Sequence, residues 1–303
     1  MHYVEAKSLL TQWNGMNVYR GCAHGCVYCD SRSDCYRFSH PFEDIAVKQN
    51  APALLEEILR RKRKKIVIST GSMSDPYQPC EKELLLTRRC LELIDRHGFG
   101  ASVITKSDLV LRDMDLFDSI NQKAKSVLQM TLTAADERLS RILEPNVCTT
   151  ARRYEVLKAF QKRGIPAVVW MTPVLPFLTD TEENLRRILA YCFDAGVKGI
   201  VCFNMGMTLR EGCREYYYRA LDRHFPGLSQ EYRRRYGGAY EVISPNNDAL
   251  MRIFREECEK HGVLYEPDVC FQYIAELPEK QEQLSMDFLL SAAEEAGPDS
   301  AGR

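Results

Sequence analysis

Three cysteines near the start of the sequence, Cys22, Cys26 and Cys29, stand at the spacing C-x3-C-x2-C. Thiolates are the usual ligands of iron in iron–sulfur clusters, and a [4Fe–4S] cube normally takes four of them. Three thiolates from one short loop leave one iron open, and an open iron can chelate the amino and carboxylate groups of a small molecule. Gly21 and Gly25 let the backbone of this loop wrap closely around a cluster. The spacing therefore predicts a [4Fe–4S] cluster with one free coordination position.

A zinc knuckle is the alternative interpretation, with His24 or Cys35 as the fourth ligand. Zinc sites usually combine a C-x2-C pair with a second pair further along the chain, and this sequence contains no second compact pair. The other nine of the 12 cysteines are scattered singly. Free cysteine packs as a small apolar residue, so most of these nine are expected in the core or at its boundary. The iron–sulfur cluster is the favoured interpretation.

The elements that would position this loop follow a βα pattern between about residues 15 and 205. Strands are expected at residues 16–19, 66–70, 102–105, 127–132, 166–171 and 199–203, where the sequence is apolar and β-rich. Helices are expected at residues 52–64, 81–97, 150–163 and 181–194; the last three stop at Gly98, Gly164 and Gly196, as left-handed helix ends require. This α/β alternation predicts a parallel sheet that curls toward a partial barrel, with functional groups at the carboxyl ends of its strands.

The sequence divides by pattern into three parts. Residues 13–205 form the βα core, residues 206–276 a helical extension, and residues 277–303 a flexible, disordered acidic tail. Within the extension, helices are expected near residues 213–224 and 247–261, flanking an irregular stretch at 227–246. The formal net charge of −1 excludes a globally basic nucleic-acid coat but leaves room for local basic patches. No long apolar run and no signal-peptide pattern occur, so we expect a cytoplasmic protein that does not span a membrane.

The segment around the three cysteines resembles the signature of the radical S-adenosylmethionine (SAM) superfamily, C-x3-C-x-aromatic-C, with Tyr28 in the aromatic position. The resemblance covers about residues 13–205. More narrowly, the chain is similar to the spore photoproduct lyase family at residues 69–75, 105–106, 130–133, 143–145 with Arg152 and Arg153, and 171–173. This resemblance implies a partial (β/α)6 TIM-like barrel. It also implies an enzyme that reductively cleaves SAM at a [4Fe–4S] cluster, generating a 5′-deoxyadenosyl radical that abstracts hydrogen from a substrate.

Carried over residue by residue, the resemblance implies that Tyr28 lies against the adenine of SAM and that Lys106 meets its carboxylate. Ser74, Thr131 and Thr172, also at strand ends, would supply polar contacts to SAM. The alternative for each is an ordinary strand-end residue that caps the next turn. An external one-electron donor of the flavodoxin or ferredoxin type would reduce the cluster.

Two positions depart from the lyase pattern. Ser72 stands where the hydrogen-donor cysteine of that family would fall, and Asp30 replaces the tyrosine that follows the last cluster cysteine. A serine hydroxyl is a far poorer hydrogen-atom donor than a thiol, so the scaffold does not by itself imply thymine-dimer repair. Cys35 or Cys80 could stand in for the missing thiol.

Three segments bear on partners. Six consecutive cations at residues 60–65 and a basic, aromatic-rich stretch at residues 232–236 could contact nucleic acid, or could be a solvated helix end and an ordinary interface. The hexapeptide Gln283–Phe288 resembles the short motif by which bacterial DNA-repair and replication proteins bind the sliding clamp; a short amphipathic helix folding back on the domain is the alternative.

These segments favour DNA or another nucleic acid as the substrate class. Radical modification of a small molecule or a partner protein is the second enzymatic possibility. From a different class, the alternative is a non-catalytic iron–sulfur or zinc protein that binds nucleic acid.

Overall fold

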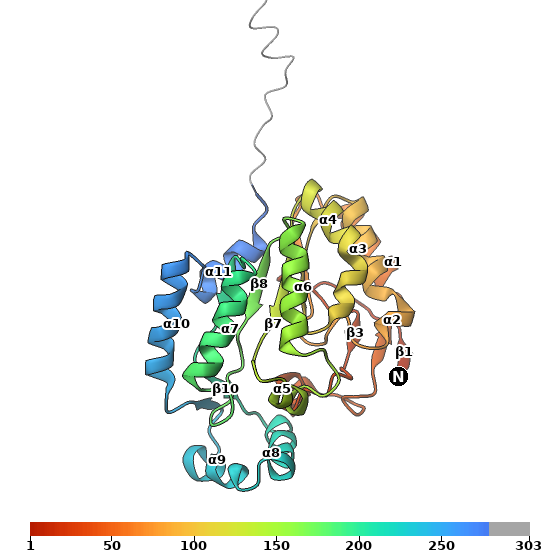
Figure 1. The fold of residues 1–303 in the computed structure, drawn as a ribbon. Helices are drawn as coiled ribbons and strands as arrows, with labels where there is room; N and C mark the ends of the chain where they lie inside the picture. The colour runs from red at the N-terminus through yellow and green to blue at the C-terminus, as the bar shows by residue number, and fades with distance from the viewer. Residues whose placement is uncertain (279–303) are drawn as a thin grey trace, which may run out of the picture.

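A parallel sheet of six strands forms the centre of the protein in the computed structural model, which describes residues 1–278 (Figure 1). The strands follow the order β2-β5-β6-β7-β8-β9, and every neighbouring pair is parallel. Their bounds are β2 (Gly15–Met16), β5 (Val67–Thr70), β6 (Gly100–Thr105), β7 (Ser126–Thr131), β8 (Ala167–Trp170) and β9 (Gly199–Val201). Spatial order equals chain order and the two end strands do not pair. The sheet is therefore an open, partial barrel, which confirms the predicted fold class.

Helices cover the outer face of this sheet (Figure 1). They are α1 (Ala51–Arg61), α3 (Leu86–Arg96), α4 (Met114–Lys123), α6 (Thr150–Lys162) and α7 (Glu182–Asp194); the shorter α2 (Glu81–Leu84) and α5 (Glu137–Leu143) lie in the connections between strands and helices. The helix α11 (Pro267–Ala275) packs on the inner face instead, where Cys270 and Ile274 contact the valines of β7, β8 and β9. The apolar face of each long crossover helix fills the main core through residues such as Leu55, Leu91, Phe117, Phe160 and Ile188. Gly98, Gly164 and Gly196 all have positive φ, so the predicted left-handed helix ends are confirmed.

Two predicted elements differ from the structure near the N-terminus. The strand expected at residues 16–19 is divided: β2 joins the barrel, whereas β3 (Tyr19–Arg20) joins a separate sheet of order β1-β4-β3 with β1 (His2–Val4) and β4 (Ala46–Lys48). The helix expected at residues 81–97 is broken at Leu85, which has a φ of 53°. The break has a physical reason, because the Glu81 carboxylate accepts hydrogen bonds from the backbone nitrogens of Thr87 and Arg88 at the start of α3.

The extension is more ordered than predicted. The helices α8 (Cys213–His224) and α10 (Asn247–His261) match their expected bounds. The stretch 227–246 was expected to be irregular, but it contains α9 (Leu228–Tyr236) and β11 (Glu241–Ile243), which pairs with β10 (Gly206–Thr208). The reason is an aromatic core that composition did not reveal, in which Tyr217 and Tyr232 are both fully buried.

The extension does not form a core of its own. Phe254 of α10 belongs to the main barrel core, while Tyr217 and Tyr232 pack in a second core with Cys26, Val27 and Tyr28 of the cysteine loop. Among residues 1–278, no helix combines the length and apolar character needed to cross a membrane. Most of the predicted tail, including the motif Gln283–Phe288, lies outside the described residues.

Candidate functional site

A pocket of about 820 Å³ opens at the carboxyl ends of the barrel strands. Its wall includes the strand ends Thr70, Thr105 and Thr131 together with the loops that follow them. The site residues predicted from the sequence all line this one pocket: Cys22, Cys26, Cys29, Tyr28, Ser74, Lys106, Thr131 and Thr172. Residues from separate βα units thus meet where the fold predicts that functional groups collect.

The cysteine loop is held in a fixed curve between β3 and the turn Asp30–Arg32. The backbone nitrogen of Cys22 donates to the carbonyl of Phe42 at 3.1 Å, and that of Val27 donates to Leu143 at 2.9 Å. Gly21 has a φ of 91°, and a Cβ at this position would lie 2.4 Å from the Phe42 carbonyl oxygen. Only glycine therefore allows the chain to pass this close to the neighbouring loop.

The three thiols do not all lie as close together as a single zinc ion requires. A tetrahedral zinc with Zn–S bonds of about 2.3 Å needs sulfur atoms roughly 3.8 Å apart. Within the described part of the chain, only one group of three metal-binding side chains has all its ligand atoms within 4.8 Å, and it is not the cysteine group. Thiolates are the ligands that an iron–sulfur cluster takes, so Cys22, Cys26 and Cys29 fit the predicted cluster by their chemistry. His24 pairs with Asp75.

His24 forms a buried ion pair with Asp75, with His24 Nδ1 3.3 Å from Asp75 Oδ2. Burial acts to lower the pKa of His24, but the Asp75 carboxylate outweighs burial and raises this pKa to about 9. Burial acts to raise the pKa of Cys22, yet its hydrogen bond to the His24 imidazolium leaves the Cys22 pKa below its ordinary value. Burial raises the pKa of Cys26 and of Cys29. Cys22 is therefore the loop thiol most readily converted to the thiolate that iron binds.

Asp75 also fixes the strand end that carries Lys106. Its carboxylate accepts from the Thr105 hydroxyl at 2.7 Å and from the Lys106 backbone nitrogen at 2.8 Å. Burial acts to lower the pKa of Lys106, but the charges of Cys26 and Glu144 outweigh burial and the pKa is raised. The side chain therefore stays an ammonium, as a partner of a carboxylate must.

A buried ion pair lies beneath the candidate adenine site. Arg153 Nη2 donates to Glu144 Oε2 at 2.5 Å, and both side chains are almost completely buried. Glu144 also accepts from the Tyr28 hydroxyl, and Arg153 Nη1 donates to the Thr131 carbonyl at 3.1 Å. This pair therefore positions two of the predicted SAM contacts, Tyr28 and Thr131. The sequence motif contained both charged residues, but it gave no sign that they contact each other.

The Ser74 hydroxyl has a structural partner, because it donates to the Tyr19 carbonyl at 2.8 Å. Toward a ligand it can then act only as an acceptor. This capping contact is the alternative that the sequence left open for the strand-end hydroxyls.

The two departures from the lyase pattern both lie at the pocket. Ser72 lines it, and Asp30 accepts from the Tyr36 hydroxyl at 3.0 Å and pairs with Arg210 at 3.1 Å. Tyr36 also lines the pocket, whereas Cys35 and Cys80 are not among the lining residues. Tyr36, which the sequence did not single out, is thus nearer to the reaction space than either stand-in thiol.

Aromatic side chains gather on one part of the pocket wall. Trp170, Phe203 and Phe271 lie with ring centroids between 5.7 and 6.3 Å apart. Trp13 and Phe203, which also line the pocket, are 82% and 52% exposed. Large apolar side chains left exposed beside a pocket are typical of ligand-binding surfaces.

The two basic segments lie away from this wall. Residues 60–65 precede the amino end of β5, whereas the pocket opens at the carboxyl end of that strand. Arg60 and Arg61 form ion pairs with glutamates of α1 at 2.7 Å. In the second segment, Tyr232 is fully buried and its hydroxyl donates to the Pro176 carbonyl at 2.8 Å. Tyr232 is therefore a core residue, and its ring is not available for stacking on a base.

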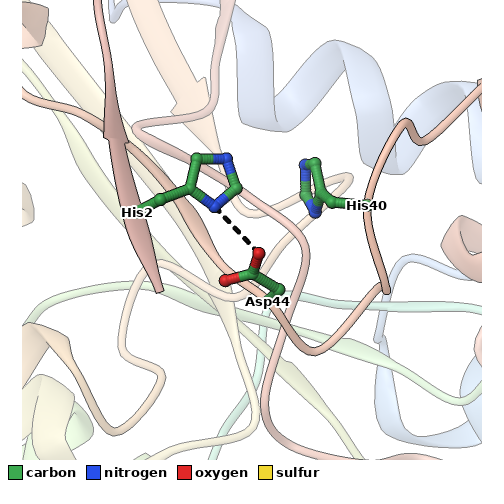
Figure 2. Close-up of side chains that lie close together, drawn as sticks. All are labelled: His2, His40 and Asp44. Carbon is green, nitrogen blue, oxygen red and sulfur yellow. Dashed lines mark hydrogen bonds and ion pairs between the residues drawn. The ribbon is translucent and has the colours of Figure 1, made fainter.

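Outside the pocket, His2, His40 and Asp44 form the group whose potential metal ligands all lie within 4.8 Å (Figure 2). His2 Nδ1 lies 3.0 Å from Asp44 Oδ2, which ties β1 to the loop that leads into β4. The pKa of Asp44 is lowered first by the nitrogen of Met1 and then by His2. The three side chains are partly exposed. They lie too far apart in the sequence for any motif to have predicted that they meet.

Comparisons with known proteins agree with this geometry. The profile of the Radical SAM superfamily matches residues 16–189. An uncharacterized protein of Mycobacterium tuberculosis is 32% identical over 227 residues, which cover 73% of this chain and 66% of that protein. An uncharacterized protein of Methanocaldococcus jannaschii is 35% identical over 170 residues, covering 55% of this chain and 62% of that protein. The matched part of the chain spans slightly less than two thirds of the length of these relatives.

Among solved structures, spore photoproduct lyase complexed with dinucleoside spore photoproduct matches with a TM-score of 0.59 and 15% identity, covering 82% of this chain and 74% of that one. A mutant of the same lyase matches with a TM-score of 0.61 and 13% identity, covering 87% of this chain and 80% of that one. At these identities the likeness shows a shared fold.

Proposed function

This chain belongs to the radical SAM superfamily, and on that premise we propose that it is an enzyme that cleaves SAM reductively and abstracts hydrogen from a nucleic-acid substrate. Cys22, Cys26 and Cys29 would hold the [4Fe–4S] cluster. The observation that carries the proposal is convergence. The three cysteines and the strand-end residues meet in one pocket although the chain presents them between positions 22 and 172.

When bound and reduced, the cluster supplies the electron that cleaves SAM into methionine and a 5′-deoxyadenosyl radical. The chain's own residues bind SAM and orient it. The ammonium of Lys106 meets the carboxylate of SAM, and Tyr28, whose ring centroid lies 5.9 Å from Lys106 Nζ, offers its face to the adenine. Thr131 and Thr172 line the same pocket, and their hydroxyls would bond the remaining polar groups of SAM.

The aromatic wall supports a nucleobase as the group that enters the pocket. Every base has a π-face, and stacking on an aromatic side chain contributes about 1–3 kcal/mol per base. The pocket volume of about 820 Å³ lies in the upper part of the roughly 300–1,000 Å³ range of small-molecule sites. It therefore has room for a base beside SAM. With Ser72 in place of a thiol, the quenching step of the lyases is not part of this proposal.

The test of SAM cleavage is anaerobic reconstitution with iron and sulfide, followed by dithionite and SAM, with 5′-deoxyadenosine quantified by chromatography. Cys26→Ala should abolish the product. The matched control Cys35→Ala removes an exposed thiol outside the pocket and should retain both the cluster and the product. A chain that binds one zinc, takes up no iron and ignores SAM would refute the proposal.

The substrate class is tested by the binding of a fluorescent single-stranded DNA to the reconstituted protein. Phe203→Ala should weaken binding by about tenfold, since one stacking contact contributes roughly 1–3 kcal/mol. Tyr3→Ala removes an equally exposed aromatic side chain outside the pocket and should leave binding unchanged. Equal affinities for all three proteins would turn the search toward small molecules or partner proteins.

A further inference from the structure

A second cavity of about 870 Å³ lies on the opposite side of the cysteine loop from the pocket. It opens between α5 and α8, which lie side by side at one end of the molecule (Figure 1). The loop divides its residues between the two cavities. Cys22, His24, Cys26 and Tyr28 line the pocket, whereas the intervening Gly25 and Val27 line the second cavity. In the described part of the chain the two cavities share no lining residue, so the loop is a thin wall between them.

This second cavity, here called the basic groove, is strongly positive. Arg138 and Arg141 of α5 line it together with Arg219 and Arg223 of α8, and among residues 1–278 Glu137 is its only acidic lining residue. Arg141 lies 3.7 Å from Glu137, while the other three arginines have no carboxylate partner among the described residues. All four arginines are exposed. In a chain whose formal net charge is −1, this is a marked local excess of positive charge.

We propose that the basic groove docks the one-electron donor, a small electron carrier whose surface around its redox group is acidic. The inference rests on the proposed function, because it supplies the electron that SAM cleavage consumes. In the transfer, the carrier is oxidised by one electron and the cluster is reduced by one electron. No bond is made or broken and no proton moves.

Geometry favours this side of the loop for electron entry. Consecutive Cα atoms are about 3.8 Å apart, so a carrier that contacts Gly25 or Val27 lies one residue from Cys26. Gly25 makes the wall thin as well as curved, because it has a φ of 72° and a Cβ would lie 3.2 Å from Pro145. On the other side, SAM and substrate would occupy the pocket, and a carrier approaching there would compete with both.

Position favours an acidic electron carrier over a nucleic acid as the occupant. The groove has no lining residue in common with the pocket, so a nucleic acid bound in it would be separated by the loop from the chemistry that modifies it. An electron can cross that loop. Four arginines around a concave surface also steer an acidic partner toward it, and such steering raises the association rate in a salt-dependent way.

The test compares two double variants that change the net charge equally. Arg138→Glu with Arg219→Glu reverses two groove charges, and Arg63→Glu with Lys64→Glu reverses two exposed charges at the far end of the barrel. Binding of flavodoxin, an acidic flavoprotein, is measured by fluorescence titration at low and high salt. We expect the groove variant to bind on the order of tenfold more weakly at low salt, and the control to bind as the parent does. High salt should remove most of the difference.

A second readout separates this inference from the proposed function. With reduced flavodoxin below saturation, formation of 5′-deoxyadenosine should fall in the groove variant by the same factor as binding. With dithionite, which needs no docking surface, the groove variant and the parent should match. If dithionite gives no product with the parent, the proposed function fails while the binding titration still tests the groove. Flavodoxin binding that survives the groove substitutions overturns the inference, and so does a loss confined to the binding of single-stranded DNA.

Discussion

Replacing Glu144 by glutamine is expected to weaken both the fold and the binding of SAM. Arg153 is fully buried, and the structure leaves its Nε without a hydrogen-bond partner. The guanidinium therefore depends on Glu144 for its countercharge. Breaking a buried ion pair on one side costs about 3–5 kcal/mol, since an uncompensated charge remains. With an unfolding entropy of about 2.1 cal/mol/K per residue, the free energy of unfolding of a chain of this length changes by roughly 0.6 kcal/mol for each degree near Tm. The loss of about 3–5 kcal/mol should therefore lower Tm by about 5–8 °C.

A double variant tests whether the charge is the cause. Arg153→Met removes the guanidinium, so Glu144→Gln with Arg153→Met should recover much of the stability that Glu144→Gln alone loses. SAM affinity should not recover in parallel, because Tyr28 and Thr131 still lack the groups that hold them. Thermal unfolding followed by circular dichroism and SAM binding followed by calorimetry measure the two effects. If Glu144→Gln melts within about 1 °C of the parent, or the double variant is no more stable than the single one, the reasoning is wrong.

The same residue gives a pH dependence. Burial acts to raise the pKa of Glu144, but Arg153 outweighs burial and holds it below its ordinary value of 4.5. Near that pH the unfolded chain takes up a proton that the native chain does not, so stability falls as the pH drops. The contribution of Glu144 is complete above pH 4.5 and is lost as the pH falls through its native pKa. Stability of Glu144→Gln should therefore decline less steeply below pH 4.5 than that of the parent; parallel curves would contradict this assignment.

Two further predictions concern the pocket wall. Gly71→Ala should destabilise the protein by about 2–4 kcal/mol in a denaturant titration, because a Cβ there would lie 2.1 Å from the Ile104 carbonyl oxygen and the φ is 102°. Gly98→Ala, with positive φ but open space around it, should cost only about 1–2 kcal/mol, and equal losses would show that the contact is unimportant. Lys106→Met should weaken SAM binding about 10- to 100-fold, as the loss of a charge-assisted hydrogen bond of about 1.5–3 kcal/mol predicts, with little change in Tm. Unchanged SAM affinity in calorimetry would remove Lys106 from the site.

The sequence was most informative where one local segment determines the outcome. The cysteine spacing lies within a single loop, and the helix ends at Gly98 and Gly164 need only a residue that accepts a left-handed conformation. Strand ends could be placed together because parallel βα units bring their carboxyl ends to one edge. The pocket therefore contains the residues that local pattern and resemblance had selected.

The remainder depends on contacts between distant segments. Tyr28 and Glu144 are 116 positions apart, and the His24–Asp75 pair joins the cysteine loop to the loop that follows β5. Neither contact leaves a periodicity that could be read from the chain. The break at Leu85 was missed for the same reason, because the Glu81 carboxylate that caps α3 is itself held by Arg112 at 2.8 Å.

The distribution of thiol acidity has a consequence for how the cluster would be assembled. Cys22 is the thiol of the loop whose pKa falls below its ordinary value, while burial raises the pKa of Cys26 and of the core thiols Cys90 and Cys192. Incoming iron would thus bind first at Cys22, the loop thiol with the lowered pKa, while the core thiols with raised pKa values would compete little for it. Once captured there, the metal charge would promote ionisation of the neighbouring thiols.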